Sequence, residues 1–462
     1  MRTACACLCV AAFAALGAAP ASGYLKLHPE NPRYFQETAT GRAVMIASCA
    51  GVVPTSRTVD NNRLIAEMIK WRVSYGRVWH FLPWGGDRVD WPWMRSDVPG
   101  AYMGGRGGNR FDMDRWNPVY WNKMRTVLGR CAAAGIYCEI HLFDRCGMSP
   151  ASDTRWGNNP WASDNNVNNL ETPEAKADGT PDFYLYASRP NLRNQQERYV
   201  RKMIDETIGF SNIIYEIENE HWQYPNPDFA AHYANFVKDY IARKHPNSPR
   251  LVSYSSLQED LEEFYTIPYV DIVNRHFGNE AERNPAALND YIESRWDKNK
   301  AINIDEFANG VEDPDLLRKM CWIIVTSGGN FHIEDALPSS KPFEVVGNIR
   351  LFRERSRWDF THSAPNKTLV TSGGGYCMAR PGAEYVFYFP KGGTKTVKLL
   401  PAKQHRAAWW DPRTGEWLSQ DKRRHIGRDP FVNAKRFRQS GAEAQFTTPN
   451  DEDWILYVRS RA

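Results

Sequence analysis

The chain has 462 residues, a formal net charge of +4 at pH 7, 13% aromatic residues and 17 tryptophans. This charge is small for the length, and the basic residues are dispersed, which argues against a nucleic-acid partner. Beyond the amino terminus, no stretch is long and apolar enough to span a bilayer. Composition therefore excludes a membrane-spanning or nucleic-acid-binding protein and favours a globular one.

The first 23 residues have the features of a signal peptide. Arg2 supplies a positive start, residues 4–19 form a small apolar run, and residues 21–23 (Ala-Ser-Gly) fit the small-residue rule for cleavage. We therefore expect a mature start near Tyr24 and a secreted or periplasmic location. A short membrane anchor is the alternative, although the apolar run is short for a span.

The cysteines indicate no metal site. Cys138 and Cys321 lie in apolar segments and are predicted to be packed thiols. One disulfide is compatible with an oxidising compartment, but the sequence does not select its pair. Because CxxC spacing and an HExxH motif are both lacking, we predict neither a metal nor a cofactor. Six cysteines follow the signal segment: Cys49, Cys131, Cys138, Cys146, Cys321 and Cys377.

Short β-type runs alternate with helical stretches from about residue 42 to residue 358. Asn117 before Pro118 and Asp313 before Pro314 place a capping residue ahead of a proline at two helix starts. The runs predicted as strands are 44–48, 73–80, 136–143, 213–218, 251–254, 271–276, 301–305 and 329–333. The stretches predicted as helices are 61–71, 118–134, 192–208, 229–244, 286–298, 314–326 and 342–357, with a shorter one at 258–265.

Eight strands that are each followed by a helix predict an α/β fold, a (β/α)8 TIM barrel, over residues 24–362. An open doubly wound sheet would also alternate, but residues 47–51 (ASCAG) are not the glycine-rich phosphate loop expected after its first strand. In a barrel, catalytic residues gather at the carboxyl ends of the strands.

The composition changes near residues 363–367, and short alternating runs follow. Residues 411–417 (DPRTGEW) read as a turn between two of them. We predict a small antiparallel β-sandwich over residues 363–462. Its strands are expected at 376–380, 384–389, 395–399, 406–410, 444–448 and 454–458.

Two carboxylates stand where apolar strands end. Glu220 follows the fourth predicted strand, and Glu306 follows the seventh. Acids are rare where a strand leaves a core unless they do chemistry. A facing pair at this end of a barrel can hydrolyse a glycosidic bond, with one acid protonating the leaving oxygen and the other attacking the anomeric carbon. Asp305 has the opposite parity to Glu306, so we expect it to point away from the barrel interior. The alternatives are a rim salt bridge for Glu220, and Asp305 as the nucleophile.

Other polar side chains fall on the same strands. Arg77 is expected to hold the nucleophile anionic through charge-assisted hydrogen bonds, and Glu216 is interpreted as an internal partner for Arg77. Each histidine alone is more often a core residue than a ligand, but several at the strand ends of one barrel favour substrate contacts. The predicted substrate-binding residues are Asn219, Arg77, His141, His276, Trp222, Trp79, His80, His332 and Trp84, with Asp144 and Arg275 as weaker candidates and Glu218 unassigned.

Two long loops, 82–116 and 144–189, are expected on the catalytic face. Their tryptophans lie among Gly, Pro, Asn and Asp, which predicts exposed indoles that stack on sugar faces, unless they fill the core instead. Their arginines suggest an acidic or sulfated sugar, or else stack on the tryptophans and pin the loops. The tryptophans are Trp84, Trp91, Trp93, Trp156 and Trp161, and the arginines are Arg88, Arg95, Arg106, Arg110, Arg115, Arg145 and Arg155.

Several stretches carry a family resemblance that covers nearly the whole mature chain. Residues 28–35 (HPENPRYF) and 41–48 (GRAVMIAS) resemble the entry strands of cellulase-like clan A glycoside hydrolases, including the apiosidase-like group. Residues 407–415 (AAWWDPRTG), 446–449 (FTTP) and 453–456 (DWIL) resemble the collagen-binding-type domain that ends many such enzymes. We expect that domain to be a sandwich packed on the barrel.

The resemblance implies retaining hydrolysis, with Glu220 as acid/base and Glu306 as nucleophile. Asn219-Glu220 matches the Asn-Glu signature at the end of strand four, and Asn219 would bind the sugar 2-hydroxyl. A second Asn-Glu pair ends at Glu280, in a polar loop that no strand feeds in the right phase. The chain departs from the family at strand eight, where Phe331-His332 replaces a common tryptophan, which leaves the substrate open.

The sequence therefore predicts a secreted retaining glycoside hydrolase that acts on an oligo- or polysaccharide. The main alternative is a non-catalytic carbohydrate-binding protein on a barrel scaffold, which would not need the two carboxylates to face each other. A metal-dependent hydrolase lacks a clustered ligand set, and an adhesin that binds protein would need an exposed apolar patch on the C-terminal domain. Sugar, linkage, exo or endo action and oligomeric state stay open.

Overall fold

The computed structural model describes residues 23–80, 89–100, 108–145, 147, 156–172, 182–220, 227–256, 262–278, 284–308, 311, 313–333, 340–401, 404–419, 424–425, 429–431, 436–437 and 443–461. The predicted signal peptide lies outside these residues except for Gly23.

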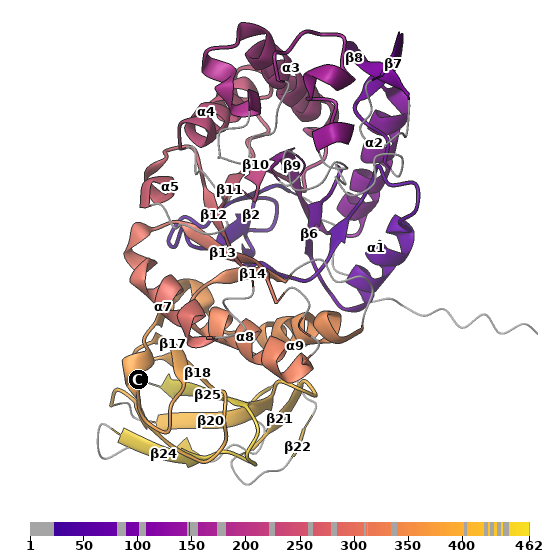
Figure 1. Ribbon diagram of the computed structural model, residues 1–462. Coiled ribbons are helices and arrows are strands. Elements are labelled where there is room, and N and C mark those ends of the chain that lie inside the picture. Colours follow the sequence, from indigo (N-terminus) through magenta and orange to yellow (C-terminus); the bar gives the residue numbers. More distant parts are fainter. Residues whose placement is uncertain are drawn as a thin grey trace, which may run out of the picture.

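A parallel sheet curls into a barrel with helices around it (Figure 1). Its strand order is β4-β14-β13-β12-β11-β10-β9-β6-β5. The segment 47–52 closes the sheet, because its first part pairs with β14 and its second part pairs with β6. The predicted eight-stranded barrel is thus confirmed. Its strands are β4 (Ala47–Ser48), β5 (Gly51–Val52), β6 (Tyr75–Val78), β9 (Tyr137–Asp144), β10 (Ile213–Asn219), β11 (Val252–Ser256), β12 (Ile272–Gly278), β13 (Ala301–Phe307) and β14 (Asn330–Ile333).

The helices begin where the sequence predicts caps. The side chain of Asn117 accepts a hydrogen bond from the backbone N–H of Val119, and Asp313 accepts one from Asp315, each just before a proline at the first helical position. No helix in the described ranges is both long and apolar enough to cross a bilayer. The helices are α1 (Asn61–Lys70), α2 (Pro118–Ala133), α3 (Pro190–Thr207), α4 (Pro227–Lys244), α5 (Glu262–Thr266), α7 (Ala286–Ser294), α8 (Pro314–Thr326) and α9 (Ser340–Ser356).

The two ends of the barrel interior differ in character. At the amino end, the first inward residues of the strands, such as Tyr137, Ile214 and Ile272, form an apolar cluster. A small sheet of β1 (Leu25–Leu27), β2 (Phe35–Glu37) and β3 (Ala43–Val44) contributes Leu25, Phe35 and Val44 to this cluster. Further along the strands the inward positions are polar, and there the candidate site is built.

The loop tryptophans are buried rather than exposed. The long loop after β6 contains a hairpin of β7 (Trp93–Pro99) and β8 (Asn109–Trp116). The ring centroid of Trp93 lies 5.1 Å from that of Trp161 and 6.2 Å from that of Trp116. Trp91, Trp93, Trp156 and Trp161 are all at most 7% exposed. The prediction that they offer open sugar platforms is therefore wrong for these four, because they form the aromatic core on which the loops fold. Trp84 lies outside the described residues.

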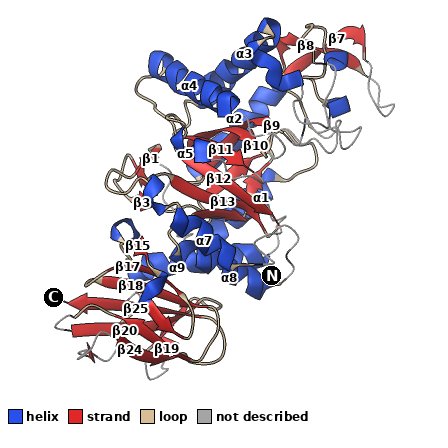
Figure 2. Cartoon of the chain, turned by 60° about the vertical axis from the view of Figure 1, so that its left-hand side comes forward, coloured by secondary structure: helices blue, strands red, loops and turns tan. Residues whose placement is uncertain are grey.

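The C-terminal segment forms the predicted β-sandwich, which packs on α8 and α9 (Figure 2). Alternate residues of its large sheet face two different cores. Leu456 and Val458 face the small sheet, whereas Ile455 and Tyr457 belong to the main core with the barrel. The large sheet contains β15 (Ala364–Pro365), β17 (Tyr376–Arg380), β18 (Glu384–Phe389), β25 (Trp454–Arg461), β20 (Gln404–Asp411), β21 (Glu416–Leu418), β22 (Arg424–His425) and β23 (Arg436–Phe437). The small sheet contains β16 (Val370–Ser372), β19 (Thr394–Lys398) and β24 (Glu443–Thr447).

A buried ion pair joins the barrel to the sandwich. Arg318 of α8 binds both carboxylate oxygens of Asp453, with Nε and Nη2 donating at 3.1 and 2.7 Å. The Tyr388 hydroxyl donates to the same carboxylate at 3.1 Å. This arrangement and the stacking of Trp322 on Tyr388 agree with a sandwich fixed to the barrel.

The described cysteines form no disulfide among themselves. Cys49, Cys131, Cys138, Cys321 and Cys377 are not bonded to one another and all are buried, as predicted for Cys138 and Cys321. Cys146 lies outside the described residues.

Candidate active site

Arg77 of β6 is the centre of the polar end of the barrel. Its side chain is fully buried, and its three nitrogens point to three different strands. Nε donates to His141 Nε2 at 2.9 Å, Nη1 donates to Glu306 Oε1, and Nη2 donates to Asn219 Oδ1. The predicted contact between Arg77 and the candidate nucleophile is therefore present. A guanidinium that forms such charge-assisted bonds holds a carboxylate in its anionic form and in one orientation.

Asp305 also points into the barrel, and here the parity prediction is wrong. Its Oδ2 lies 3.3 Å from Arg77 Nη1, and its Oδ1 lies 3.4 Å from His332 Nδ1. Asp305 continues the inward series of Ala301 and Asn303 along β13. Regular alternation would therefore turn Glu306 outward.

Glu306 reaches the site because the strand stops being regular at that residue. Its φ is +43°, and the β13–β14 register shifts between Asp305 and Phe307. A left-handed backbone at a non-glycine residue is rare and costs about 1–3 kcal/mol, so it persists where the surrounding structure imposes it. Both acids of the Asp-Glu pair thus reach Arg77.

Glu220 also has a left-handed backbone, with φ +53°, directly after β10. One carboxylate oxygen each of Glu220 and Glu306 and one ring nitrogen of His276 all lie within 4.8 Å of one another. The two carboxylates therefore face each other. Their side chains differ in exposure, at 19% for Glu220 and 5% for Glu306, so Glu220 has the easier proton exchange with solvent.

His276 of β12 lies between the two carboxylates. Its Nδ1 is 3.7 Å from Glu220 Oε1, and its Nε2 is 3.3 Å from Glu306 Oε2. Burial, opposed by the charge of Asp305, lowers the pKa of His276 to about 3. The ring is therefore neutral near pH 7 and offers one N–H donor rather than a second cation.

A second layer of ionisable groups lies beneath the carboxylates. Glu216 Oε2 is 3.6 Å from Arg77 Nη2 and 3.2 Å from His141 Nε2, consistent with its predicted role as an internal partner of Arg77. Burial raises the pKa of Glu216 well above its usual range, against the pull of Arg77, and Glu139 adds to the rise. Burial acts on Asp305 in the same direction, but Arg77 and the hydrogen bond from His332 hold the pKa of Asp305 below its ordinary value. The layer thus favours a neutral Glu216 and an anionic Asp305.

Some of the other predicted residues are exposed to the site, and others lie buried beneath the carboxylates. Trp79 is partly exposed, its ring lies 4.6 Å from the Arg77 guanidinium, and it meets His141 edge-on at 4.5 Å. His141 and His332 are at most 2% exposed and lie below the carboxylates, where they contact Arg77 and Asp305. Trp222 and Trp84 lie outside the described residues.

His80 and Arg275 turn away from this group. The Nδ1 atom of His80 is 2.8 Å from the Tyr120 hydroxyl on α2, and burial lowers the pKa of His80 to about 4. Arg275 lies over the rings of Phe277 and Tyr291, at 4.8 and 5.7 Å. Both side chains therefore contact residues outside the barrel interior. Asn219 stays with the site: its Nδ2 donates to Asp144 at 3.3 Å.

Glu139 and the neighbours of Glu218 were not among the residues predicted from the sequence. Glu139 of β9 accepts hydrogen bonds from Tyr75, from Ser253 at 2.5 Å and from Asn274 at 3.3 Å, all inside the barrel. The available signal was alternation, because Glu139 shares the strand face of His141. Glu218 accepts a hydrogen bond from Tyr184, a loop residue whose position no strand pattern predicts.

Two groups of described residues combine metal-ligand types within 4.8 Å, namely Glu220–His276–Glu306 and Glu139–His141–Glu216. In both, the Arg77 guanidinium already pairs with one carboxylate, Glu306 or Glu216. A divalent cation would have to sit beside that fixed charge. The Arg77 guanidinium thus already supplies the positive charge that these carboxylates need, which disfavours a metal ion beside them.

The arginines of the two long loops differ in their surroundings. The guanidinium of Arg95 lies 3.9 Å from the centroid of the Phe111 ring and donates to the carbonyl of Asn109, as the loop-pinning interpretation predicts. Arg145, at the end of β9, is 1% exposed, and its Nη1 and Nη2 have no hydrogen-bond partner among the described residues. Arg88, Arg106 and Arg155 lie outside the described residues.

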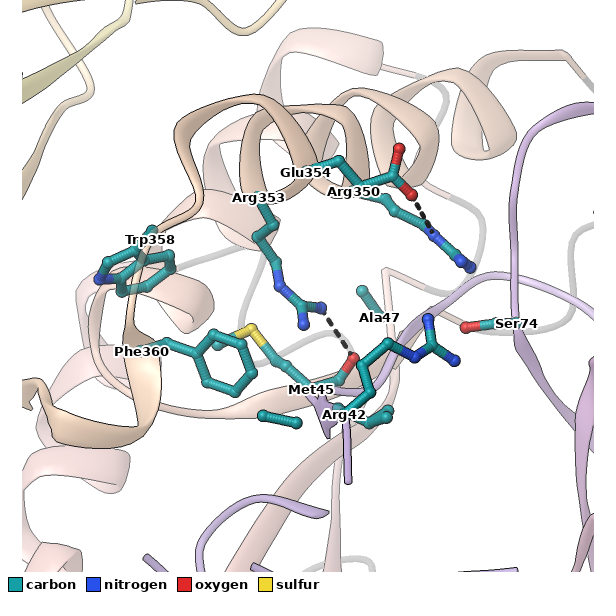
Figure 3. Close-up of a pocket in the computed structure, with 11 residues that line it drawn as sticks. Arg42, Met45, Ala47, Ser74, Arg350, Arg353, Glu354, Trp358 and Phe360 are labelled. Carbon is teal, nitrogen blue, oxygen red and sulfur yellow. Dashed lines mark hydrogen bonds and ion pairs between the residues drawn. The ribbon is translucent and has the colours of Figure 1, made fainter. Parts of the chain in front are cut away.

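A cavity of about 190 Å³ lies at the opposite end of the barrel (Figure 3). Its walls include Ser74 just before β6, Ala47 at the start of β4, and Arg353 of α9, which donates to the Met45 carbonyl at 3.1 Å. These positions mark the amino ends of the strands. In such barrels, residues at the amino ends of the strands usually contribute to stability rather than to catalysis.

Comparisons with known proteins agree with this architecture. Residues 365–459 match the family model described as "Putative collagen-binding domain of a collagenase". No curated protein is similar enough in sequence to match the chain. Among solved structures, a putative glycoside hydrolase from Bacteroides vulgatus superposes with a TM-score of 0.65 at 11% identity, over 95% of this chain and 82% of that one.

A glycoside hydrolase family 5 protein from the same organism superposes with a TM-score of 0.62 at 12% identity, over 96% of this chain and 95% of that one. A third structure, titled "Glycoside hydrolase", gives 0.60 at 12% identity, over 95% and 97%. At these identities the likeness shows the fold alone. The predicted resemblance is confirmed at that level: the chain has the barrel-plus-sandwich fold of clan A glycoside hydrolase structures and ends in a collagen-binding-type sandwich.

Proposed function

We propose that this protein is a secreted glycoside hydrolase that cleaves O-glycosidic bonds with retention of configuration. The observation that carries the proposal is the separation of the two facing carboxylates, whose nearest oxygens lie within 4.8 Å. Retaining enzymes hold the pair about 5–5.5 Å apart, whereas inverting enzymes need about 6.5–9.5 Å to admit a water molecule. A merely sugar-binding barrel has no need for such a pair, so the geometry favours catalysis over the non-catalytic alternative.

In the first step, Glu306 attacks the anomeric carbon while Glu220 donates its proton to the leaving oxygen. A glycosyl ester on Glu306 forms, the glycosidic C–O bond breaks, and the aglycone leaves with the proton. In the second step, Glu220 removes a proton from water, whose oxygen attacks the anomeric carbon and releases Glu306. Both residues return to their starting protonation states.

The surrounding residues support these roles. Arg77 keeps Glu306 ionised and aimed, and the neutral ring of His276 contacts both acids without adding charge. Asn219 lies on β10 beside Glu220, and its amide, which makes only a 3.3 Å bond to Asp144, can donate to the sugar 2-hydroxyl. Trp79 contributes a partly exposed aromatic face.

The test is hydrolysis of an aryl-glycoside panel and polysaccharides by wild type, Glu306→Ala, Glu220→Ala and Glu280→Ala. The first two changes should lower kcat by at least about 10³-fold. Glu280→Ala alters the other Asn-Glu dipeptide and is the matched control, so its rate should stay near wild type. Proton NMR of the first product should show the anomer of the substrate.

Three results would reject the proposal in different ways. Full activity of Glu306→Ala would remove the assigned nucleophile. An inverted product anomer would remove the double displacement. Loss of activity on chelation, with recovery on adding a divalent cation, would favour the metal-dependent alternative at Glu220, His276 and Glu306.

A further inference from the structure

Three arginines lie in one row across neighbouring strands of the large sandwich sheet. Arg406 of β20 stands directly opposite Arg436 of β23 on one side and Arg459 of β25 on the other. Directly opposite residues of antiparallel strands point to the same face, so the arginine row (Arg406, Arg436 and Arg459) spans two strand spacings, roughly 10 Å. Like charges placed opposite each other destabilise a sheet, so the row calls for a compensating negative charge.

One end of the arginine row has that compensation. The Nε atom of Arg459 lies 3.3 Å from Glu384, and its Nη2 donates to the carbonyls of Ser356 and Arg357 at 3.0 and 3.1 Å. Arg406 and Arg436 form no ion pair with any residue in the described ranges. The Nε atom of Arg406 is moreover buried and has no hydrogen-bond partner there.

The unpaired guanidinium groups open onto a cavity of about 290 Å³. The whole arginine row lines it, together with Gln404, Asp429, Phe431 and Ser460. Phe431 is buried and stacks on Tyr457 at 5.4 Å, which gives the cavity a rigid apolar wall. Asp429 is the one acid among the lining residues, and its Oδ1 already accepts from the Phe431 backbone N–H.

The flanking sequence offers little negative charge to fill this role. Residues 422–442 contain seven lysines and arginines and a single acid, Asp429. This concentration departs from the otherwise dispersed basic residues of the chain. Two neighbouring cations, a cavity and a basic flanking sequence favour an external anion over an internal partner.

The geometry points to a binding site on the sandwich for the sulfate or carboxylate groups of an anionic polysaccharide. Guanidinium groups bind both kinds of oxyanion through paired N–H donors. A row of about 10 Å along one small cavity suits groups spaced along one sugar chain, whereas duplex nucleic acid calls for a longer basic stripe. The site lies on a different domain from Glu220 and Glu306, and it holds whether or not those residues cleave the same polymer.

The experiment is affinity electrophoresis of the full-length protein in gels that contain heparin, polygalacturonate or dextran. Heparin presents sulfate groups in addition to carboxylates, polygalacturonate presents carboxylates alone, and dextran is the neutral comparison. Arg436→Gln and Arg406→Gln should each weaken binding to at least one anionic polymer by about tenfold. The matched control is Arg380→Gln: Arg380 is on β17, at the far side of the same sheet, and pairs with Asp359 at 3.0 Å. Its binding should stay at the wild-type level.

Equal weakening by Arg380→Gln would show attraction to net charge alone and would overturn the site. Unchanged binding by both row variants, or no binding of wild type to either anionic polymer, would do the same. Duplex DNA that competes equally and depends on the same arginines would assign the site to nucleic acid. Arg436 is exposed, so Arg436→Gln should fold even where Arg406→Gln does not, and aryl-glycoside hydrolysis by both should match wild type.

Discussion

Arg77 and Arg406 show two ways in which one fold uses a guanidinium group. Arg77 is fully buried and has three carboxyl groups at or within 3.6 Å, from Glu216, Asp305 and Glu306. Arg406 is partly exposed, lies beside two further arginines and has no carboxylate partner in the described ranges. The first cation has every partner it needs inside the protein, whereas the second lacks one.

The difference follows from burial. Burying a charge is costly unless nearby groups compensate it, and the acids around Arg77 provide this compensation, while Arg77 in turn fixes where they point. A partly solvated charge can stay unpaired at modest cost, so Arg406 remains free to bind an external anion. The paired guanidinium of Arg77 positions the acids of the site, whereas the unpaired guanidinium of Arg406 is available to bind an anion.

Arg77→Lys should cause the largest loss, because it keeps the charge and removes the fork that reaches three strands. A single ammonium cannot contact Glu306, Asn219 and His141 together. We expect kcat on an aryl glycoside to fall on the order of 10²–10³-fold. Thermal unfolding measured in parallel should show a folded protein. A kcat within a factor of three of wild type would mean that the pairing around Arg77 serves stability alone.

Asp453→Ala should come next, with a cost in stability rather than in chemistry. It leaves the Arg318 guanidinium and the Tyr388 hydroxyl without their shared partner between barrel and sandwich. Breaking a buried pair costs about 3–5 kcal/mol, and we expect the lower end because Arg318 also pairs with Asp315 at 2.6 Å.

Thermal denaturation and limited proteolysis measure this effect. The matched control is Asp451→Ala, at an exposed position of the same turn, which should change stability by less than about 0.5 kcal/mol. If both variants melt alike, the joint between barrel and sandwich does not depend on the ion pair.

Apolar runs predicted the barrel well because parallel strands are buried on both faces and read as short continuous hydrophobic segments. The helix at 314–326 was predicted to the residue, since Asp313-Pro314 marks its start. Counting strands also brought Glu220 and Glu306 to the same end of the barrel. These predictions depend on local patterns, which the sequence contains in full.

The sequence could not show where regular strands end. Strand alternation predicted that Asp305 points outward, but its side chain faces Arg77. Glu306 reaches the same guanidinium because its φ is +43° and the strand register shifts at that point. The prediction that the loop tryptophans are exposed was wrong for a related reason. Gly, Pro and Asn around Trp93 and Trp161 correctly indicated loops, but these loops have an aromatic core of their own. The amino-acid composition of a segment indicates that it is a loop, but it does not indicate whether the side chains of that loop are buried.

Glu216→Gln should have the smallest effect, and a pH-dependent one. The pKa of Glu216 is raised in the folded protein by burial, so its contribution to stability is fully present below its unfolded pKa, near 4.5, and is lost as pH rises toward the folded value. Glutamine has nearly the same shape and does not ionise, so that loss disappears. The variant should match wild type at pH 4 and melt on the order of 2 °C higher at pH 8. A lower melting temperature at pH 8 would instead mean that Glu216 is anionic there, and that Arg77 pairs with three charged acids rather than two.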